Sequence, residues 1–143
     1  MASSLTGSTS VAQPGLPVAR GSSIQLLLRL EGLAVAAVTA LVYARTGVSW
    51  WLFLALWLVP DISMLGYLSG ACRGARIYNA VHTYVGPVAM GACAYLLHAN
   101  VVALAIALTW ANHIGVDRLL GYGLKYGEGF GFTHLGRLGK ERR

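Results

Sequence analysis

The chain has 143 residues, of which 56% are hydrophobic and only 11% are charged, and its mean hydropathy is +0.60. A soluble domain of this size carries more charge on its surface, so the composition excludes an ordinary soluble protein and indicates a membrane protein. The net charge of +6 would suggest a nucleic-acid partner in a soluble protein. Here the basic residues lie in predicted loops and at helix ends, where the positive-inside rule explains them, so we expect the lipid bilayer and no nucleic acid as partner.

The first half of the chain predicts a tail and two membrane spans. Residues 1–24 are mostly Ser, Thr, Gly, Pro and Ala, a composition typical of a disordered tail. A first span is expected over 26–44, followed by a short loop at 45–49. A second span is expected over 50–68, with Pro60 inside it, where proline would bend the helix.

The second half predicts two more spans and a polar tail. A basic loop at 69–76 precedes a third span at 77–97, which contains Pro87. A short turn leads to a fourth span at 101–120, and a tail at 121–143 is rich in glycine, aromatic and basic residues. The predicted fold is therefore all-α, an integral membrane bundle of four transmembrane helices over residues 25–120.

The distribution of basic residues predicts the orientation of this bundle. Ten of the eleven lysine and arginine residues lie at one face of the predicted bundle, and Arg45 alone lies at the other. The positive-inside rule then places both termini in the cytoplasm. The expected location is the cell membrane, crossed several times.

Ionisable residues inside the predicted spans converge on one layer. Asp61, His82 and His113 lie about five to seven residues from the cytoplasmic ends of their spans, which corresponds to depths of roughly 8–11 Å. His113 and Asp117 are four residues apart and therefore share a helix face. An ionisable residue within a span is costly and marks function or a pairing need, so this layer is the strongest functional signal in the sequence.

The types of residue in this layer suit a divalent metal, although no metal-binding motif with diagnostic spacing is present. Imidazole and carboxylate groups are common ligands of divalent cations. The candidate ligands are Asp61, His82, His113, Asp117 and His134. In a purely structural alternative, Asp61 pairs with Arg29 or Arg118, and the histidines bond backbone groups that the prolines leave free.

Further residues near the cytoplasmic face are candidates for substrate binding. Arg73 and Arg118 could hold an anionic head group, and Asn79 and Tyr122 lie near the same layer. The tail interleaves glycines with aromatic residues, which favours an anchor at the membrane surface. The alternative is a lid that carries His134 over the cytoplasmic mouth.

Three stretches carry a family resemblance: PDISMLGYL, YNAVHTY and HIGVDRLLGYGLKYGEGFGFTHLGRLG. At these stretches the sequence resembles a bacterial family of small membrane proteins known as domain of unknown function 4260, over about residues 26–139. The resemblance implies a compact bacterial four-helix membrane protein and supplies no activity, substrate or cofactor.

Two classes of function fit the polar layer. In the first, the protein is an enzyme that uses a metal on a lipophilic substrate, with Asp61, His113 and Asp117 as catalytic groups. In the second, it is a non-catalytic small-molecule binder, transport component or accessory subunit with the same residues as a fixed network. The sequence decides neither whether the chain is an enzyme nor whether a metal binds.

Overall fold

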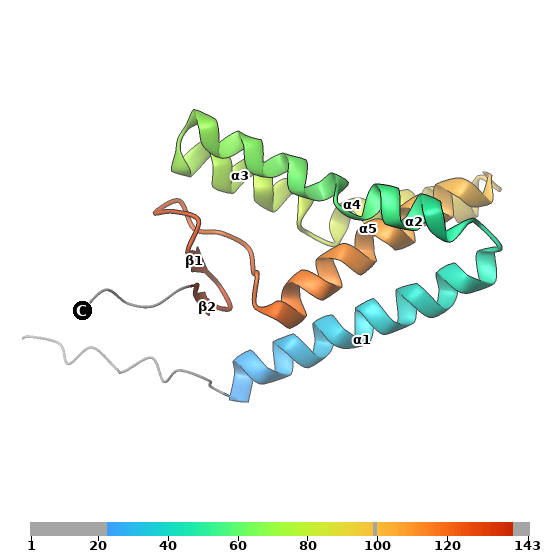
Figure 1. Cartoon of the computed structure of the whole chain (residues 1–143), viewed down its shortest axis with the longest axis horizontal. Coiled ribbons are helices and arrows are strands. Elements are labelled where there is room, and N and C mark those ends of the chain that lie inside the picture. The colour runs from blue at the N-terminus through green and yellow to red at the C-terminus, as the bar shows by residue number, and fades with distance from the viewer. Residues whose placement is uncertain (1–22, 99, 139–143) are drawn as a thin grey trace, which may run out of the picture.

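The computed structural model describes residues 23–98 and 100–138 and is mostly helical (Figure 1). Helix α1 spans Ser23–Thr46, α2 spans Trp50–Trp57, and the 3₁₀ helix η1 spans Val59–Ser69. Helices α3, α4 and α5 follow at Ala71–Val81, Val85–Leu96 and Val101–Leu120, and a hairpin of β1 (Phe132–Thr133) and β2 (Gly136–Arg137) ends the described chain. The predicted N-terminal tail lies outside the described residues, except for its last two, which begin α1.

Helix α5 packs against α1, α4 and α2, and α1 lies beside it in the opposite direction (Figure 1). Helices α1 and α5 approach closely because glycine faces glycine where they meet. A Cβ atom on Gly32 would lie 2.7 Å from the carbonyl oxygen of Gly115, and one on Gly115 would lie 2.9 Å from the backbone nitrogen of Ala36. Small residues at such crossings are typical of helix pairs in membranes.

The expected second and third spans are each interrupted. Leu58 separates α2 from η1, and Pro60 occupies the first turn of η1, where the missing N–H of proline does least harm. The expected basic loop at 69–76 instead forms the start of α3, after Gly70 with a φ of 105°. The third span is broken at residues 82–84, and Pro87 lies in the first turn of α4.

The C-terminal segment folds back over the helices. Helix α5 ends in a Schellman motif, in which Gly121 adopts a φ of 95°, its N–H donates to the carbonyl of Arg118, and the N–H of Tyr122 donates to the carbonyl of Asp117. The amide of Asn79 on α3 then forms two hydrogen bonds with the backbone of Lys125, at 2.7 and 2.8 Å. The tail is therefore packed on the helices that position the site.

Candidate metal centre

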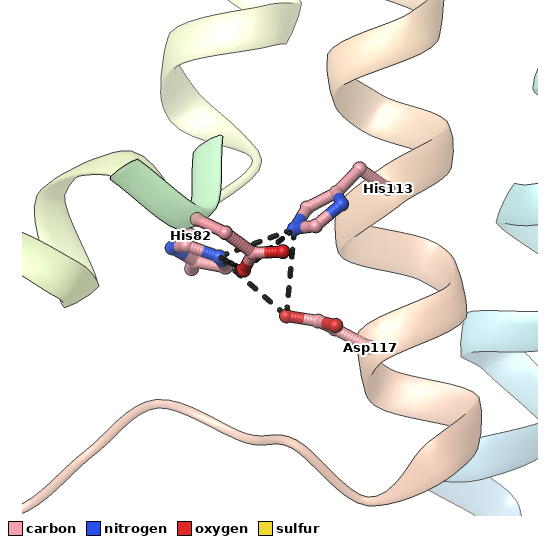
Figure 2. A group of neighbouring side chains, drawn as sticks. His82, His113 and Asp117 are labelled. Carbon is pink, nitrogen blue, oxygen red and sulfur yellow. Dashed lines mark hydrogen bonds and ion pairs between the residues drawn. The ribbon is translucent and has the colours of Figure 1, made fainter. Parts of the chain in front are cut away.

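Four of the five candidate metal ligands converge on one point. Asp61 comes from η1, His82 from the break after α3, and His113 and Asp117 from adjacent turns of α5. One ligand atom from each of the four residues lies within 4.8 Å of the others. Figure 2 shows His82, His113 and Asp117 pointing toward one another. Both histidine side chains are buried, and each lies within 4 Å of both carboxylates.

Five of the six distances between the ligand atoms match a tetrahedral ion, and the sixth, between the two carboxylates, is within 4.8 Å. The Nε2 atoms of His82 and His113 are 3.3 Å apart. Asp61 Oδ1 lies 3.6 and 3.5 Å from these two nitrogens, and Asp117 Oδ2 lies 3.5 and 3.7 Å from them. Ligands placed about 2.0–2.2 Å from a tetrahedral ion lie about 3.3–3.6 Å from one another. Two carboxylates and two neutral imidazoles would also balance the charge of a divalent cation.

The local fold presents His82 in a form that can bind a cation. His82 caps the C-terminus of α3, where its Nδ1 lies 3.1 Å from the carbonyl oxygen of Tyr78. With its proton on Nδ1, the ring donates to this carbonyl and turns the lone pair of Nε2 to the site. The ring of Tyr78 also stacks on His82 at 3.7 Å between centroids. One nitrogen of His82 thus bonds the carbonyl of Tyr78, while the other faces the cluster. This carbonyl also accepts the backbone N–H of His82, so it is not a group that a proline leaves free, as the structural alternative expected.

Three residues that support the ligands complete the surroundings. The Tyr78 hydroxyl donates to Asp117 Oδ2 at 3.1 Å. The Trp57 ring packs edge-on against His113 at 5.0 Å, and its Nε1 donates to the Asn112 side chain at 3.0 Å. Asn112 in turn donates to the carbonyl of Ala36 on α1 at 2.7 Å. Trp57 and Asn112 were not predicted from the sequence, although an asparagine inside a span beside His113 was a usable signal.

The four ligands differ in their access to the surroundings. The side chains of His113 and His82 are 1% and 3% exposed, and that of Asp117 is 15% exposed. The side chain of Asp61 is 36% exposed. Asp61 therefore marks the open side of the cluster.

The fifth candidate ligand, His134, lies outside this group. Its Nε2 is 2.7 Å from a guanidinium nitrogen of Arg118, and its Nδ1 accepts from the backbone N–H of Leu124 at 2.8 Å. Burial lowers the pKa of His134, and the neighbouring charge of Arg118 lowers it further. Arg118 also donates to the carbonyl of His82 at 3.2 Å, so it holds the backbone of a ligand.

The remaining substrate-binding candidates lie around the site at different distances. Both ends of the Asn79 amide are bonded to the backbone of Lys125, so Asn79 fastens the tail. Tyr122 is 41% exposed, with its ring centroid 5.4 Å from the Lys125 ammonium. Arg73 is exposed on α3. None of these three described residues makes a direct hydrogen bond or ion pair with the four clustered ligands.

Lys125 is a functional candidate that the sequence analysis missed. Its side chain is buried, and its Nζ has no hydrogen-bond partner within residues 23–98 and 100–138. The ammonium lies 3.9 Å from the ring centroid of Phe130 and 5.1 Å from that of Tyr78. Burial lowers the pKa of Lys125 to about 8, against an attraction to Asp117 that raises it. Only the folded tail creates this environment, so the sequence alone carried no signal for it.

Comparison with known proteins identifies the family and nothing further. The chain has no match among curated proteins or among solved structures. The family model described as domain of unknown function (DUF4260) matches residues 25–138, which include all four clustered ligands and the packed tail. The match confirms the resemblance seen at the three sequence stretches. The chain therefore belongs to the family of domain of unknown function 4260.

Proposed function

We propose that this chain is an integral membrane protein whose helices cross a bacterial inner membrane four times. Two segments, Ser23–Thr46 and Trp50–Ser69, are long and apolar enough to cross a membrane, yet only 17% and 11% of their apolar windows are buried within the fold. Apolar helices left uncovered to this extent need a non-aqueous environment. In the proposed topology, α3 with α4 forms the third crossing and α5 forms the fourth.

The proposed orientation places both termini and the metal cluster toward the cytoplasm. It rests on the excess of basic residues at one face of the bundle. Alkaline phosphatase and a fluorescent protein, fused in turn to the C-terminus, test it. A fluorescent fusion with an inactive phosphatase is expected, and an active phosphatase would contradict the orientation.

The function that the geometry supports best is binding of a divalent metal by Asp61, His82, His113 and Asp117. The observation that carries it is the set of five His–His and His–Asp distances between 3.3 and 3.7 Å. Without a cation, two carboxylates would face each other across two buried imidazoles, which is costly in a bilayer. A bound cation removes that cost by ligation.

We further propose that the metal supports an enzymatic reaction on a lipophilic substrate. A bound divalent cation polarises a carbonyl or activates a water molecule, and Asp61 is the ligand that an incoming group would displace or share because it is the most exposed. Asp117 and His113, fixed on α5, would hold the ion while this happens. Arg118, behind His82, would orient that ligand through its carbonyl.

One observation favours a non-catalytic role as the second candidate. All four corners of the tetrahedron are protein atoms, and closed four-coordinate sites are typical of structural metals. In that role the ion would fasten η1 and the end of α3 to α5. A variant with Asp61→Leu separates the two roles. The site is catalytic if Asp61→Leu keeps its metal and its stability but loses the wild-type phenotype, and if the control variant Glu31→Leu keeps that phenotype.

Elemental analysis of purified protein tests the metal itself. We expect about one divalent ion per chain in the wild type and in His98→Ala, a control histidine at the turn between α4 and α5, well away from the cluster. His113→Ala and Asp117→Ala should lose the ion, because each removes one of the two ligands that α5 fixes in place, whereas Asp61 is the exposed ligand whose loss the site could tolerate. A wild-type protein that binds no divalent ion after incubation with excess zinc, cobalt or manganese would overturn the proposal.

A further inference from the structure

An apolar groove borders the candidate metal centre. The groove encloses about 470 Å³, which is within the range of ligand sites. It lies between η1, α3 and α5, and its lining includes Val59, Pro60, Ile77, Val81, Ile106 and Trp110.

The groove borders the metal centre along three of the four elements that line it; the fourth is α2, which contributes Leu56. Pro60 directly precedes Asp61, and Val81 directly precedes His82. On α5, Trp110 lies one turn before His113. The walls of the groove and the ligands of the metal are therefore consecutive parts of the same segments.

Two polar groups of the lining are hydrogen-bonded to backbone carbonyls, so the surface of the groove is mostly apolar. The Thr109 hydroxyl donates to the carbonyl of Ala105 at 2.9 Å, and the Trp110 indole N–H donates to the carbonyl of Val81 at 2.8 Å. The Ser63 hydroxyl, two residues after Asp61, is the lining group that lacks a hydrogen-bond partner among the described residues. A hydrocarbon chain with a polar end fits this distribution better than a polar ligand would.

The direction of the groove also matches an amphiphile in a bilayer. On α5, Ile106 lies seven residues before His113, so along this helix the groove extends about 10 Å from the cluster, away from the end of the helix at Leu120. At the other end of the groove, Ser63 and Ile77 line it beyond Asp61 on η1 and before His82 on α3. In the proposed topology this direction leads from the cytoplasmic side toward the bilayer centre. A lipid of the cytoplasmic leaflet lies the same way, with its polar end outward and its chain inward.

We propose that the groove binds the hydrocarbon chain of a long-chain amphiphile whose polar end, bearing an oxygen ligand, reaches the metal beside Asp61. This inference rests on the metal site proposed above and names the substrate class of that site. A chain held only as ordinary surrounding lipid would lie in the groove whether or not the metal is bound. Dependence on the metal is therefore the property to test.

Photolabelling in lipid nanodiscs supplies the test. The probe is a hexadecyl-chain hydroxamic acid with a diazirine at mid-chain, because a hydroxamate chelates divalent metals through two oxygens. Cobalt-loaded protein is labelled, digested and mapped by mass spectrometry, and the cobalt content of the same sample is measured. We expect adducts at groove residues to fall at least about tenfold when cobalt is removed, the change that 1.4 kcal/mol of anchoring produces.

Variants locate the chain independently of the metal. Ile106→Trp fills the groove and should abolish labelling there while cobalt remains bound, and Leu56→Trp repeats the test from α2 if the first variant fails to fold. Val102→Trp, one turn earlier on α5 and exposed, is the matched control and should label like the wild type.

The outcomes separate the two proposals. Bound cobalt with groove labelling that does not depend on the metal, or that survives in both groove-filling variants, identifies ordinary lipid and overturns the amphiphile site alone. Absence of bound cobalt overturns the metal site and the amphiphile site together. Metal-dependent labelling that is lost in Ile106→Trp and kept in Val102→Trp supports the inference.

Discussion

The hydroxyl of Tyr78 should control how tightly the site holds its metal. It donates to Asp117 Oδ2 at 3.1 Å, while its ring stacks on His82 at 3.7 Å. Replacing Tyr78 with phenylalanine removes the hydrogen bond and keeps the ring. A hydrogen bond to a charged group contributes about 1.5–3 kcal/mol, and loss of such a supporting contact weakens metal affinity about 10–100-fold. We therefore expect Tyr78→Phe to bind cobalt 10–100-fold more weakly than the wild type.

Competition with a chromophoric chelator measures this affinity, and Tyr84→Phe is the matched control. Tyr84 is a nearby tyrosine whose buried hydroxyl has no hydrogen-bond partner in the part of the chain that the structure describes, so removal of this hydroxyl should leave cobalt affinity unchanged. The absorption bands of bound cobalt should keep a tetrahedral intensity in both variants. Equal affinities of Tyr78→Phe and the wild type would refute the claim that this hydroxyl orients Asp117.

Three other predictions concern packing and the tail. Gly115→Ala should lower thermal stability by about 1–3 kcal/mol, because its Cβ would lie 2.9 Å from backbone atoms of α1, whereas Gly91→Ala, with its nearest neighbour at 3.6 Å, should not. Asn79→Ala should speed hydrogen exchange across the segment 122–137, because two hydrogen bonds to Lys125 disappear; unchanged exchange would show that other contacts hold the tail. Burial lowers the pKa of Lys125 from 10.5 to about 8, so between these values the unfolded chain binds the proton more tightly and stability rises with pH. Below about pH 8 the buried charge of Lys125 destabilises the fold, and Lys125→Met should raise the free energy of unfolding there by roughly 1–3 kcal/mol. The wild-type melting temperature should therefore rise between about pH 8 and 10.5, and this rise should be absent in Lys125→Met.

The polar cluster could be predicted because it depends on two regular quantities. The rise per residue of a helix fixed the depths of Asp61, His82 and His113, and the period of the helix placed His113 above Asp117. Consecutive helices with short connections pack as neighbours, so equal depth implied proximity. The fold class followed from the same regularity, since long apolar runs predict helices whatever their exact ends.

The interruptions of the helices and the path of the tail could not be predicted, because they depend on tertiary contacts and on local backbone conformation. Pro60 indicated a bend, but a 3₁₀ helix that continues to Ser69 depends on packing against α3. The break before α4 depends on Trp110, whose indole N–H satisfies the freed carbonyl of Val81. His134 was a candidate metal ligand, but its position could not be predicted because a glycine-rich tail can adopt many backbone conformations. After the turn at Gly121, the tail instead places His134 beside Arg118.

The division of the ligands between early and late helices has a consequence for biogenesis. In the proposed topology, Asp61 and His82 enter the membrane before α5 has been synthesised, whereas His113 and Asp117 arrive together on the last helix. Until then, Asp61 and His82 have only each other as partners within the cluster, and a charged group at the centre of a span costs about 2.5–3.5 kcal/mol. Insertion of α5 relieves that cost and completes the cluster in one step. A truncated chain that ends before α5 should therefore be retained by the insertion machinery or degraded. Metal binding then indicates that all the helices have been inserted.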